Sequence, residues 1–169
     1  MKVDDFCRKL DEHLTTRASA PERYEVAASA LCQAFRLKAD EVALFTVDSE
    51  ADVLRFVWPT KLTGTGTIPL SGKDSLAIRT LTEKKAIVNN RFSNTYHASI
   101  FEHIKTCPEG NAPNPIQRII SAPLGQGEEM HGVVQISRRG PSSNEAGNDF
   151  TKDELAALTA ITTVLSRHI

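Results

Sequence analysis

Apolar residues recur at helical spacing near both ends of the chain. Near the start, the apolar side chains three or four positions apart are Val3, Phe6, Cys7, Leu10 and Leu14. Ser19 with Glu22, and Thr151 with Glu154, form capping boxes, in which a hydroxyl residue and an acidic residue three positions later satisfy free N–H groups at a helix start. The predicted helices span residues 2–14, 20–36 and 152–168.

The strand patterns come in pairs. Apolar stretches bounded by turn residues lie at residues 41–48, 52–58, 86–90 and 119–137. The first, EVALFTVD, is apolar at both odd and even positions, which is typical of a central strand buried on both faces. The last reads as a hairpin, with Pro123 in its first strand and Gly132 in its second. Because proline lacks an N–H and glycine lacks a side chain, we expect Pro123 near the turn and Gly132 where the strand bends or a neighbour lies close.

The middle of the chain is less regular. KDSLAIRTLTEKK at residues 73–85 predicts a short helix that Ser71 or Asp74 caps. The segment before it is rich in turn formers, and residues 91–115 combine a helical middle with a proline-rich exit. Long irregular segments in compact domains usually carry function or are mobile, so we look for ligand contacts in and beside this region.

Helices at both ends frame strand hairpins, an order that indicates the α+β class with an antiparallel sheet. The stretches in question are EVALFTVDSEADVLRFVW, IPLSGKDSLAIRTLTEKKAIVNN, IISAPLGQGEEMHGVVQIS and DFTKDELAALTAITTVL. In this order and spacing they resemble the GAF domain family. The resemblance implies a GAF/PAS-like sheet of five or six strands, with the terminal helices on one face and pocket helices and loops on the other. It covers residues 20–169 and leaves residues 1–19 as an N-terminal helix and linker.

Composition narrows the partners. The 169 residues carry 20 Lys and Arg against 21 Asp and Glu, a net charge of -1, so no global field attracts nucleic acid or an anionic membrane. The start is charged within five residues and lacks the apolar stretch of a signal peptide, and no segment approaches the ~18 apolar residues of a membrane span. We therefore expect a cytoplasmic protein with neither a membrane nor nucleic acid as its partner.

Six residues are candidate ligand contacts, within a pocket that we expect between the sheet and residues 60–118. They are Arg118, Ser121, Tyr96, Phe92, Phe101 and Trp58. A guanidinium at Arg118 could hold an anion and a hydroxyl at Ser121 could orient it, although an ion pair explains Arg118 equally well. The three aromatic residues of the irregular segment could stack on a planar ligand, with core packing as the alternative, and Trp58 is core or rim in either case.

The cysteines and histidines define two further alternatives. Cys107 lies in the irregular segment, whereas Cys7 and Cys32 fall on the packed faces of predicted helices, where an inert thiol is the commoner case. Cys107 is followed by Pro108 and not by the histidine common in bilin-binding GAF domains, so a bilin is not expected. His97, His103 and Cys107 could suggest a metal, but only His103 and Cys107 share a helical face, and two ligands are too few.

The resemblance implies a non-enzymatic sensory or regulatory module that binds a small molecule and no obligatory cofactor. The alternatives are a free methionine-(R)-sulfoxide reductase, which uses pocket cysteines, and a dimerisation scaffold without a ligand. The sequence contains no kinase, phosphatase, cyclase or DNA-binding segment, so we expect any signal to pass to a downstream signalling protein or to a second copy of the chain. Because the first helix has an apolar stripe of its own, we expect a homodimer formed through the predicted helices at residues 2–14, 20–36 and 152–168.

Overall fold

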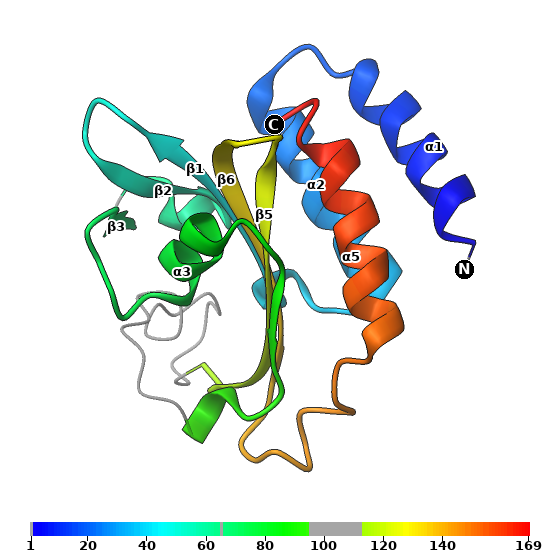
Figure 1. Ribbon diagram of the computed structural model, residues 1–169. Helices are drawn as coiled ribbons and strands as arrows, with labels where there is room; N and C mark the ends of the chain where they lie inside the picture. Colours follow the sequence, from blue (N-terminus) through cyan, green and yellow to red (C-terminus); the bar gives the residue numbers. More distant parts are fainter. Residues whose placement is uncertain (1, 65, 95–112) are drawn as a thin grey trace.

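The structure is a computed structural model that describes residues 2–64, 66–94 and 113–169. Six strands form one sheet in the order β3–β2–β1–β6–β5–β4, and every neighbouring pair is antiparallel (Figure 1). The strands are β1 (Val42–Asp48), β2 (Val53–Trp58), β3 (Thr67–Pro69), β4 (Ile87–Asn89), β5 (Ile116–Gln126) and β6 (Glu129–Arg139). The helices are α1 (Val3–Thr15), α2 (Ala20–Phe35), α3 (Leu76–Glu83) and α5 (Lys152–Leu165), and the short 3-10 turns are η1 (Ala39–Glu41), η2 (Thr60–Leu62) and η3 (Phe92–Asn94).

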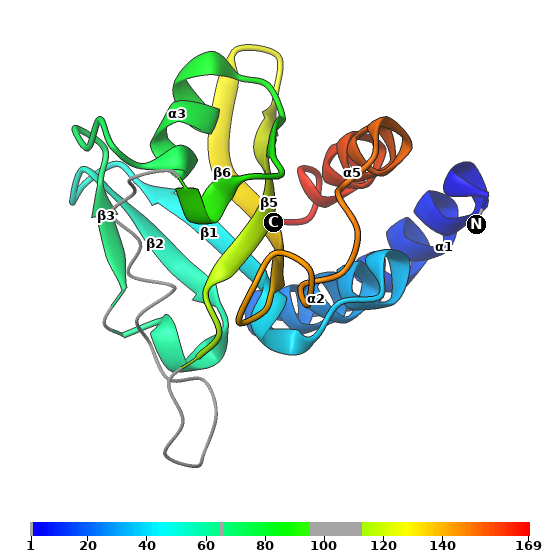
Figure 2. The same ribbon diagram turned by 90° about the horizontal axis from the view of Figure 1, so that it is seen from below.

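The helices cover the two faces of the sheet unequally. Figure 2 shows α2 and α5 against one face, which we call the helix face, with α1 outside them, and α3 on the opposite face, which we call the α3 face. This arrangement confirms the predicted α+β class, and the six strands agree with the predicted five or six. Leu10 and Leu14 of α1 belong to the same core cluster as α2 and α5, so the first helix adds to the core beyond the layer that touches the sheet.

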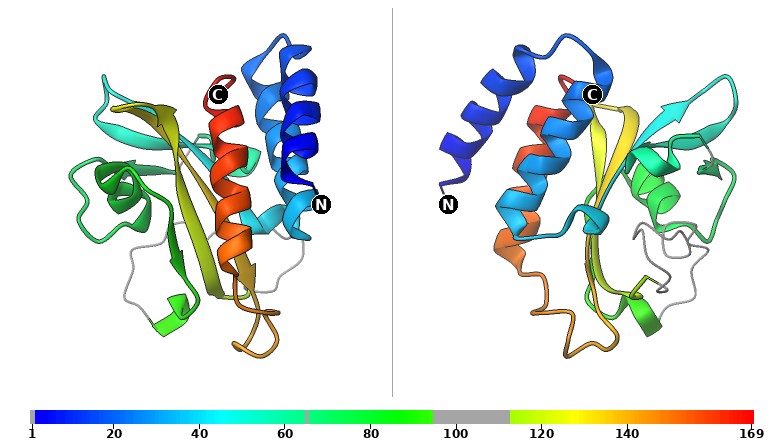
Figure 3. Two further views of the ribbon diagram at one scale, coloured as in Figure 1. Left: turned by 45° about the vertical axis from the view of Figure 1, so that its right-hand side comes forward. Right: turned by 180° about the vertical axis from the view of Figure 1, so that it is seen from behind.

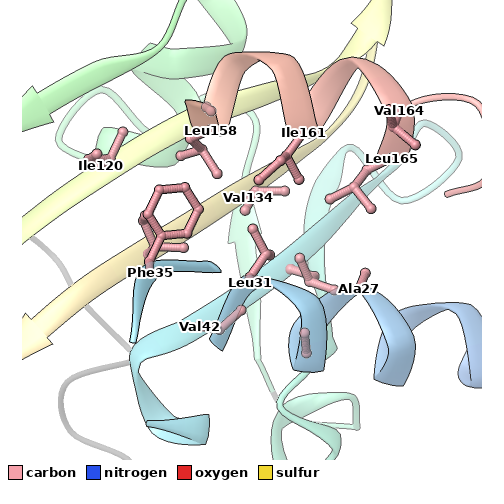
Figure 4. Close-up of a cluster of buried hydrophobic side chains, with 14 of the residues drawn as sticks. Ala27, Leu31, Phe35, Val42, Ile120, Val134, Leu158, Ile161, Val164 and Leu165 are labelled. Atoms are coloured by element: carbon pink, nitrogen blue, oxygen red, sulfur yellow. The ribbon is translucent and has the colours of Figure 1, made fainter. Parts of the chain in front are cut away.

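The main core lies between the sheet and the two helices that cover its helix face. Apolar side chains of α2, α5 and the central strands interdigitate there (Figure 4). The side chains labelled in that view are Ala27, Leu31, Phe35, Val42, Ile120, Val134, Leu158, Ile161, Val164 and Leu165. Both predicted capping boxes are present, on Ser19 for α2 and on Thr151 for α5, so local hydrogen bonding fixes where each helix begins.

The β5–β6 hairpin accommodates its proline and its glycine as the sequence predicted. Pro123 pairs with Val133 of β6 and lies beyond Ser121, the last residue of β5 that pairs with β4, so β5 has only one neighbour there. Gly132 lies between β5 and β1, where a Cβ atom would stand 2.4 Å from the carbonyl oxygen of Phe45. The close approach of β1 therefore requires glycine at this position.

Two local predictions need correction. The N-cap of α3 is Ser75, whose hydroxyl accepts from the N–H of Ile78, and not Ser71 or Asp74. Ser75 immediately precedes the first helical residue, so its hydroxyl is the one within reach of the free N–H groups. The sequence predicts only turns for residues 67–69, but they form the strand β3, which ends in Pro69 and pairs on one side only, with β2.

The apolar stripe of α1, from which the sequence predicts a homodimer, is not exposed. Of the apolar stripe on α1, Leu10 and Leu14 are buried, and the other members pack against the same core. Among the described residues, Val88 on the edge strand β4 is the only exposed large apolar side chain. Membrane-spanning length and hydropathy are not combined in any helix of the described ranges.

Candidate functional site

Three buried polar side chains meet beneath α3 on the α3 face. The hydroxyl oxygens of Thr80 on α3 and Ser121 on β5 lie 2.7 Å apart, and Gln135 Nε2 on β6 donates to Ser121 Oγ at 3.2 Å. Thr80 also donates to the carbonyl of Leu76 at 2.8 Å. Thr80 and Ser121 are fully buried and Gln135 is 8% exposed, so this polar cluster joins α3 to the two long strands largely out of reach of solvent.

An apolar layer surrounds the polar cluster. Its members come from β1, β2, β5, β6, α3, η2 and η3 and are Ala43, Phe45, Leu54, Phe56, Leu62, Ala77, Ile78, Phe92, Ile116, Ile119 and Val133. The rings of Phe45 and Phe56 are 4.3 Å apart between centroids. Phe92 is therefore on the same face as Ser121, and it is buried.

Arg139 is the buried cation of the α3 face, and the sequence analysis missed it. Arg139 is the last residue of β6. Val133 and Gln135 point to the α3 face, so the alternation of side chains along the strand places Arg139 on the same face, where it pairs with Ile116 of the apolar layer. Its Nε donates to the carbonyl of Asp40 at 3.1 Å and an Nη donates to the carbonyl of Asn114 at 3.0 Å. The same alternation, applied to the sequence of β6, would have found it.

Arg118 does not share the face of Ser121. The ladder between β5 and β6 shifts between Ile116 and Arg118, and the side chain of Arg118 turns toward the loop that leads into α5. Its Nε donates to Asp149 Oδ1 at 2.6 Å, and its two Nη atoms donate to the carbonyl and the hydroxyl of Ser143 at 2.8 and 3.2 Å. The ion-pair alternative that the sequence analysis gave describes Arg118, on the face opposite Ser121.

Trp58 also lies on the helix face. The β1–β2 ladder shifts after Leu44, so Trp58 pairs with Leu44 and packs against the main core. Its indole Nε1 is buried and has no hydrogen-bond partner among the groups of the described chain. Trp58 is therefore a partly buried residue at the main core, in agreement with the core or rim position that the sequence analysis gave it.

The remaining candidate residues are not among those that the structure describes. Tyr96, Phe101, His97, His103 and Cys107 lie outside the described residues, so these predictions are not tested. Within residues 2–64, 66–94 and 113–169, the structure contains no group of three metal-ligating side chains.

The two described thiols lie away from the α3 face. Cys7 is on α1 and Cys32 is on α2, both partly buried against the main core. Burial raises the pKa of each thiol, and nearby carboxylates add to the effect. A raised pKa disfavours the thiolate, which is the reactive form. These two positions are thus packed thiols, as the sequence predicted.

Solved structures with the same architecture are GAF domains and their relatives. The GAF domain from a phosphoenolpyruvate-protein phosphotransferase of Coxiella burnetii is 14% identical, aligns over 99% of this chain and 92% of its own, and has a TM-score of 0.75. A methyl-accepting chemotaxis protein, residues 122 to 287, is 13% identical over 94% of this chain and 93% of its own, with a TM-score of 0.69. The free methionine-R-sulfoxide reductase from Neisseria meningitidis, in complex with its substrate, is 15% identical over 98% of this chain and 87% of its own, with a TM-score of 0.66.

These likenesses establish the fold. The chain is a GAF-like domain over nearly its whole length. No family model and no curated protein matches its sequence. Because sensory domains and a reductase share this architecture, the fold alone does not choose between them.

Proposed function

We propose that this chain is a non-enzymatic regulatory module that binds a small organic molecule on the α3 face of its sheet. The observation that supports the proposal is the buried polar cluster of Thr80, Ser121 and Gln135 within an apolar layer. Small-molecule sites are typically apolar cavities with a few polar groups that fix the orientation of the ligand. Buried polar groups cost free energy unless each is hydrogen-bonded. Apolar side chains at these three positions would pack equally well without that requirement, so packing alone does not explain the polar cluster.

The α3 face favours an anionic or planar ligand. Arg139 supplies the buried cation that the sequence analysis assigned to Arg118, and Phe92 supplies an aromatic ring. A guanidinium binds carboxylates and phosphates with fixed geometry, and an aromatic side chain stacks on planar groups. Tyr96 and Phe101 remain predicted contacts beside them.

The positions of the thiols support a non-enzymatic role. A reductase that uses a nucleophilic and a resolving cysteine needs both in one pocket. Cys7 and Cys32 are on helices that cover the opposite face of the sheet, so neither can form a disulfide with a cysteine in a pocket on the α3 face. Cys107 would have to act with an external thiol alone.

A thermal-shift screen tests the ligand proposal. Cyclic nucleotides, nucleotides, amino acids and their sulfoxides are added at high concentration. A compound at a hundred times its Kd should stabilise the protein by ~2.7 kcal/mol, which raises Tm by roughly 5 to 10 °C in a domain of this size. The shift should be lost in Ser121→Ala and retained in Thr159→Ala, an exposed position on α5. No shift from any compound would favour the ligand-free scaffold.

A turnover assay tests the enzyme alternative separately. Free methionine-(R)-sulfoxide is supplied with a thiol reductant, and its loss is followed over time. We expect no turnover above the background without protein. Turnover that is abolished by Cys107→Ser would establish the reductase and overturn the non-enzymatic proposal. In the regulatory reading, the signal passes through a downstream protein or through a second copy of the chain.

A further inference from the structure

A second cleft lies on the helix face, where α2 ends and α5 begins. Figure 3 shows the last turn of α2 and the first turn of α5 at the same end of the helix layer. The cleft has a volume of about 430 Å³, which is the size of a small-molecule site. It is separate from the polar cluster beneath α3, which is on the opposite face of the sheet. Most of the side chains that line it are polar: Arg36, Arg138, Asn148, Asp149, Thr151 and Glu154.

Arg36 supplies an unpaired cation to this cleft. It ends α2 in the left-handed conformation, with a φ of 55°, where glycine is the usual residue. Lys84 ends α3 in the same conformation, and its ammonium group pairs with Glu128. The exposed side chain of Arg36 has no such partner among the residues that the structure describes. Its positive charge is therefore available to a ligand in the cleft.

Arg138 supplies a second guanidinium, which the fold already holds in place. The group lies 4.2 Å from the centre of the Phe150 ring. One Nη donates to the carbonyl of Asn148 at 2.5 Å, and the other donates to Glu154 at 2.6 Å. A guanidinium carries more N–H groups than these two contacts use. Because its orientation is fixed before binding, a ligand pays less entropy to be held by it.

The acidic side chains of the cleft do not cancel the charge of Arg36. Glu154 pairs with Arg138, and Asp149 pairs with Arg118 of β5 at 2.6 Å. Each of the two acids is thus neutralised by an arginine of its own. The charge that remains in the cleft is positive and lies at Arg36, so the cleft favours an anion over a cation.

We propose that this cleft binds the phosphate group of a small organic molecule. A phosphate monoester carries close to two negative charges at neutral pH and offers three acceptor oxygens, so it can accept from two guanidinium groups. A carboxylate has a single charge and fewer oxygens and should bind more weakly. The volume of the cleft leaves room for an organic part beside the phosphate. This site is additional to the ligand site on the α3 face and does not depend on it.

An NMR titration tests the site. Inorganic phosphate, glycerol phosphate and acetate are each added to isotope-labelled protein at constant ionic strength, because salt screens general attraction between charges. Both phosphates should shift the backbone amides of Arg36, Asn148 and Asp149 saturably, with a Kd of about 1 mM or tighter. Glycerol phosphate should bind at least as tightly as inorganic phosphate, and acetate more weakly than either. Binding of inorganic phosphate alone, acetate binding as tight as phosphate, or no saturable shift would overturn the proposal.

Two charge variants separate the cleft from general attraction. Arg36→Gln and Lys38→Gln each remove one exposed positive charge that follows α2, but only Arg36 lines the cleft. Arg36→Gln should weaken the binding of glycerol phosphate about tenfold, and Lys38→Gln should change it by less than about twofold. Because the Arg36 side chain has no partner in the described chain, urea unfolding of Arg36→Gln should match wild type, which shows that the variant folds.

The same titration distinguishes this site from the one on the α3 face. Ser121→Ala should leave the binding of glycerol phosphate unchanged, because Ser121 is on the other face of the sheet. Phosphate shifts confined to the amides of α3, or equal losses in Arg36→Gln and Lys38→Gln, would overturn the proposal. A thermal-shift screen without any hit on the α3 face would refute only the first ligand site.

Discussion

Thr80→Val should lower the stability of the whole domain, although it removes a single oxygen atom. The Thr80 hydroxyl is fully buried, and its oxygen lies 2.7 Å from Ser121 Oγ, which accepts a hydrogen bond from Gln135. Valine has nearly the same shape but no hydroxyl, so Ser121 loses a partner that water cannot replace. Leaving a buried polar group unpaired costs about 1–3 kcal/mol. For a domain of this length, the expected decrease in Tm is roughly 3 to 9 °C.

Thr82→Val on the same helix is the matched control. Thr82 also donates to the carbonyl four residues earlier, at 3.0 Å, but it is exposed. Its replacement should change the free energy of unfolding by less than about 0.5 kcal/mol. Urea unfolding followed by circular dichroism gives both values, and a double-mutant cycle with Ser121→Ala should show a coupling of about 1 kcal/mol. Equal effects of the two threonine variants would refute the role assigned to the polar cluster.

Three further predictions concern other parts of the fold. Gly132→Ala should destabilise by about 1–3 kcal/mol in urea unfolding, because its Cβ meets a backbone oxygen of β1, whereas Gly64→Ala, in open space, should be nearly neutral. A hydrogen bond from an arginine of β2 lowers the pKa of Asp48 from its ordinary value of 3.8. The stability that this carboxylate contributes is therefore complete above that pH and is lost as the pH falls through the lowered pKa. In urea unfolding, the difference in free energy between wild type and Asp48→Asn should shrink at about pH 3. Because burial raises the pKa of Cys7 and Cys32, both should react with iodoacetamide at pH 8 more slowly than a free thiol, and replacing them should reduce stability without abolishing ligand binding.

The features that the sequence predicted are those with a local physical cause. Each capping box places its helix start within one turn, since the hydroxyl and the acid act on neighbouring N–H groups. The requirement for glycine at position 132 also followed from a general property of strands. β3 gave no such signal, because three residues that end in Pro69 and pair on one edge are too few for an alternating pattern.

The candidate site shows where pattern reasoning stopped short. Arg118 and Ser121 are three positions apart in one strand, and in a regular strand such residues point to opposite faces. Applying this alternation would have placed Arg118 and Ser121 on opposite faces of the sheet. It would also have placed Arg139 on the same face as Gln135. The shift that turns Trp58 to the helix face could not be predicted, because a bulge depends on the partner strand as well as on the strand itself.

The polar cluster has no local signature, and its position limits how a ligand could act on the rest of the domain. Thr80 and Ser121 are 41 residues apart in sequence, and only the folded sheet brings them together. On β5 and β6, residues that face α3 alternate with residues such as Ala122 and Val134, which pack against the helices of the main core. Because the interior is close-packed, a displacement of α3 can reach α2 and α5 only by moving these two strands. Substitutions at Ser121 should therefore affect the packing on both faces of the sheet.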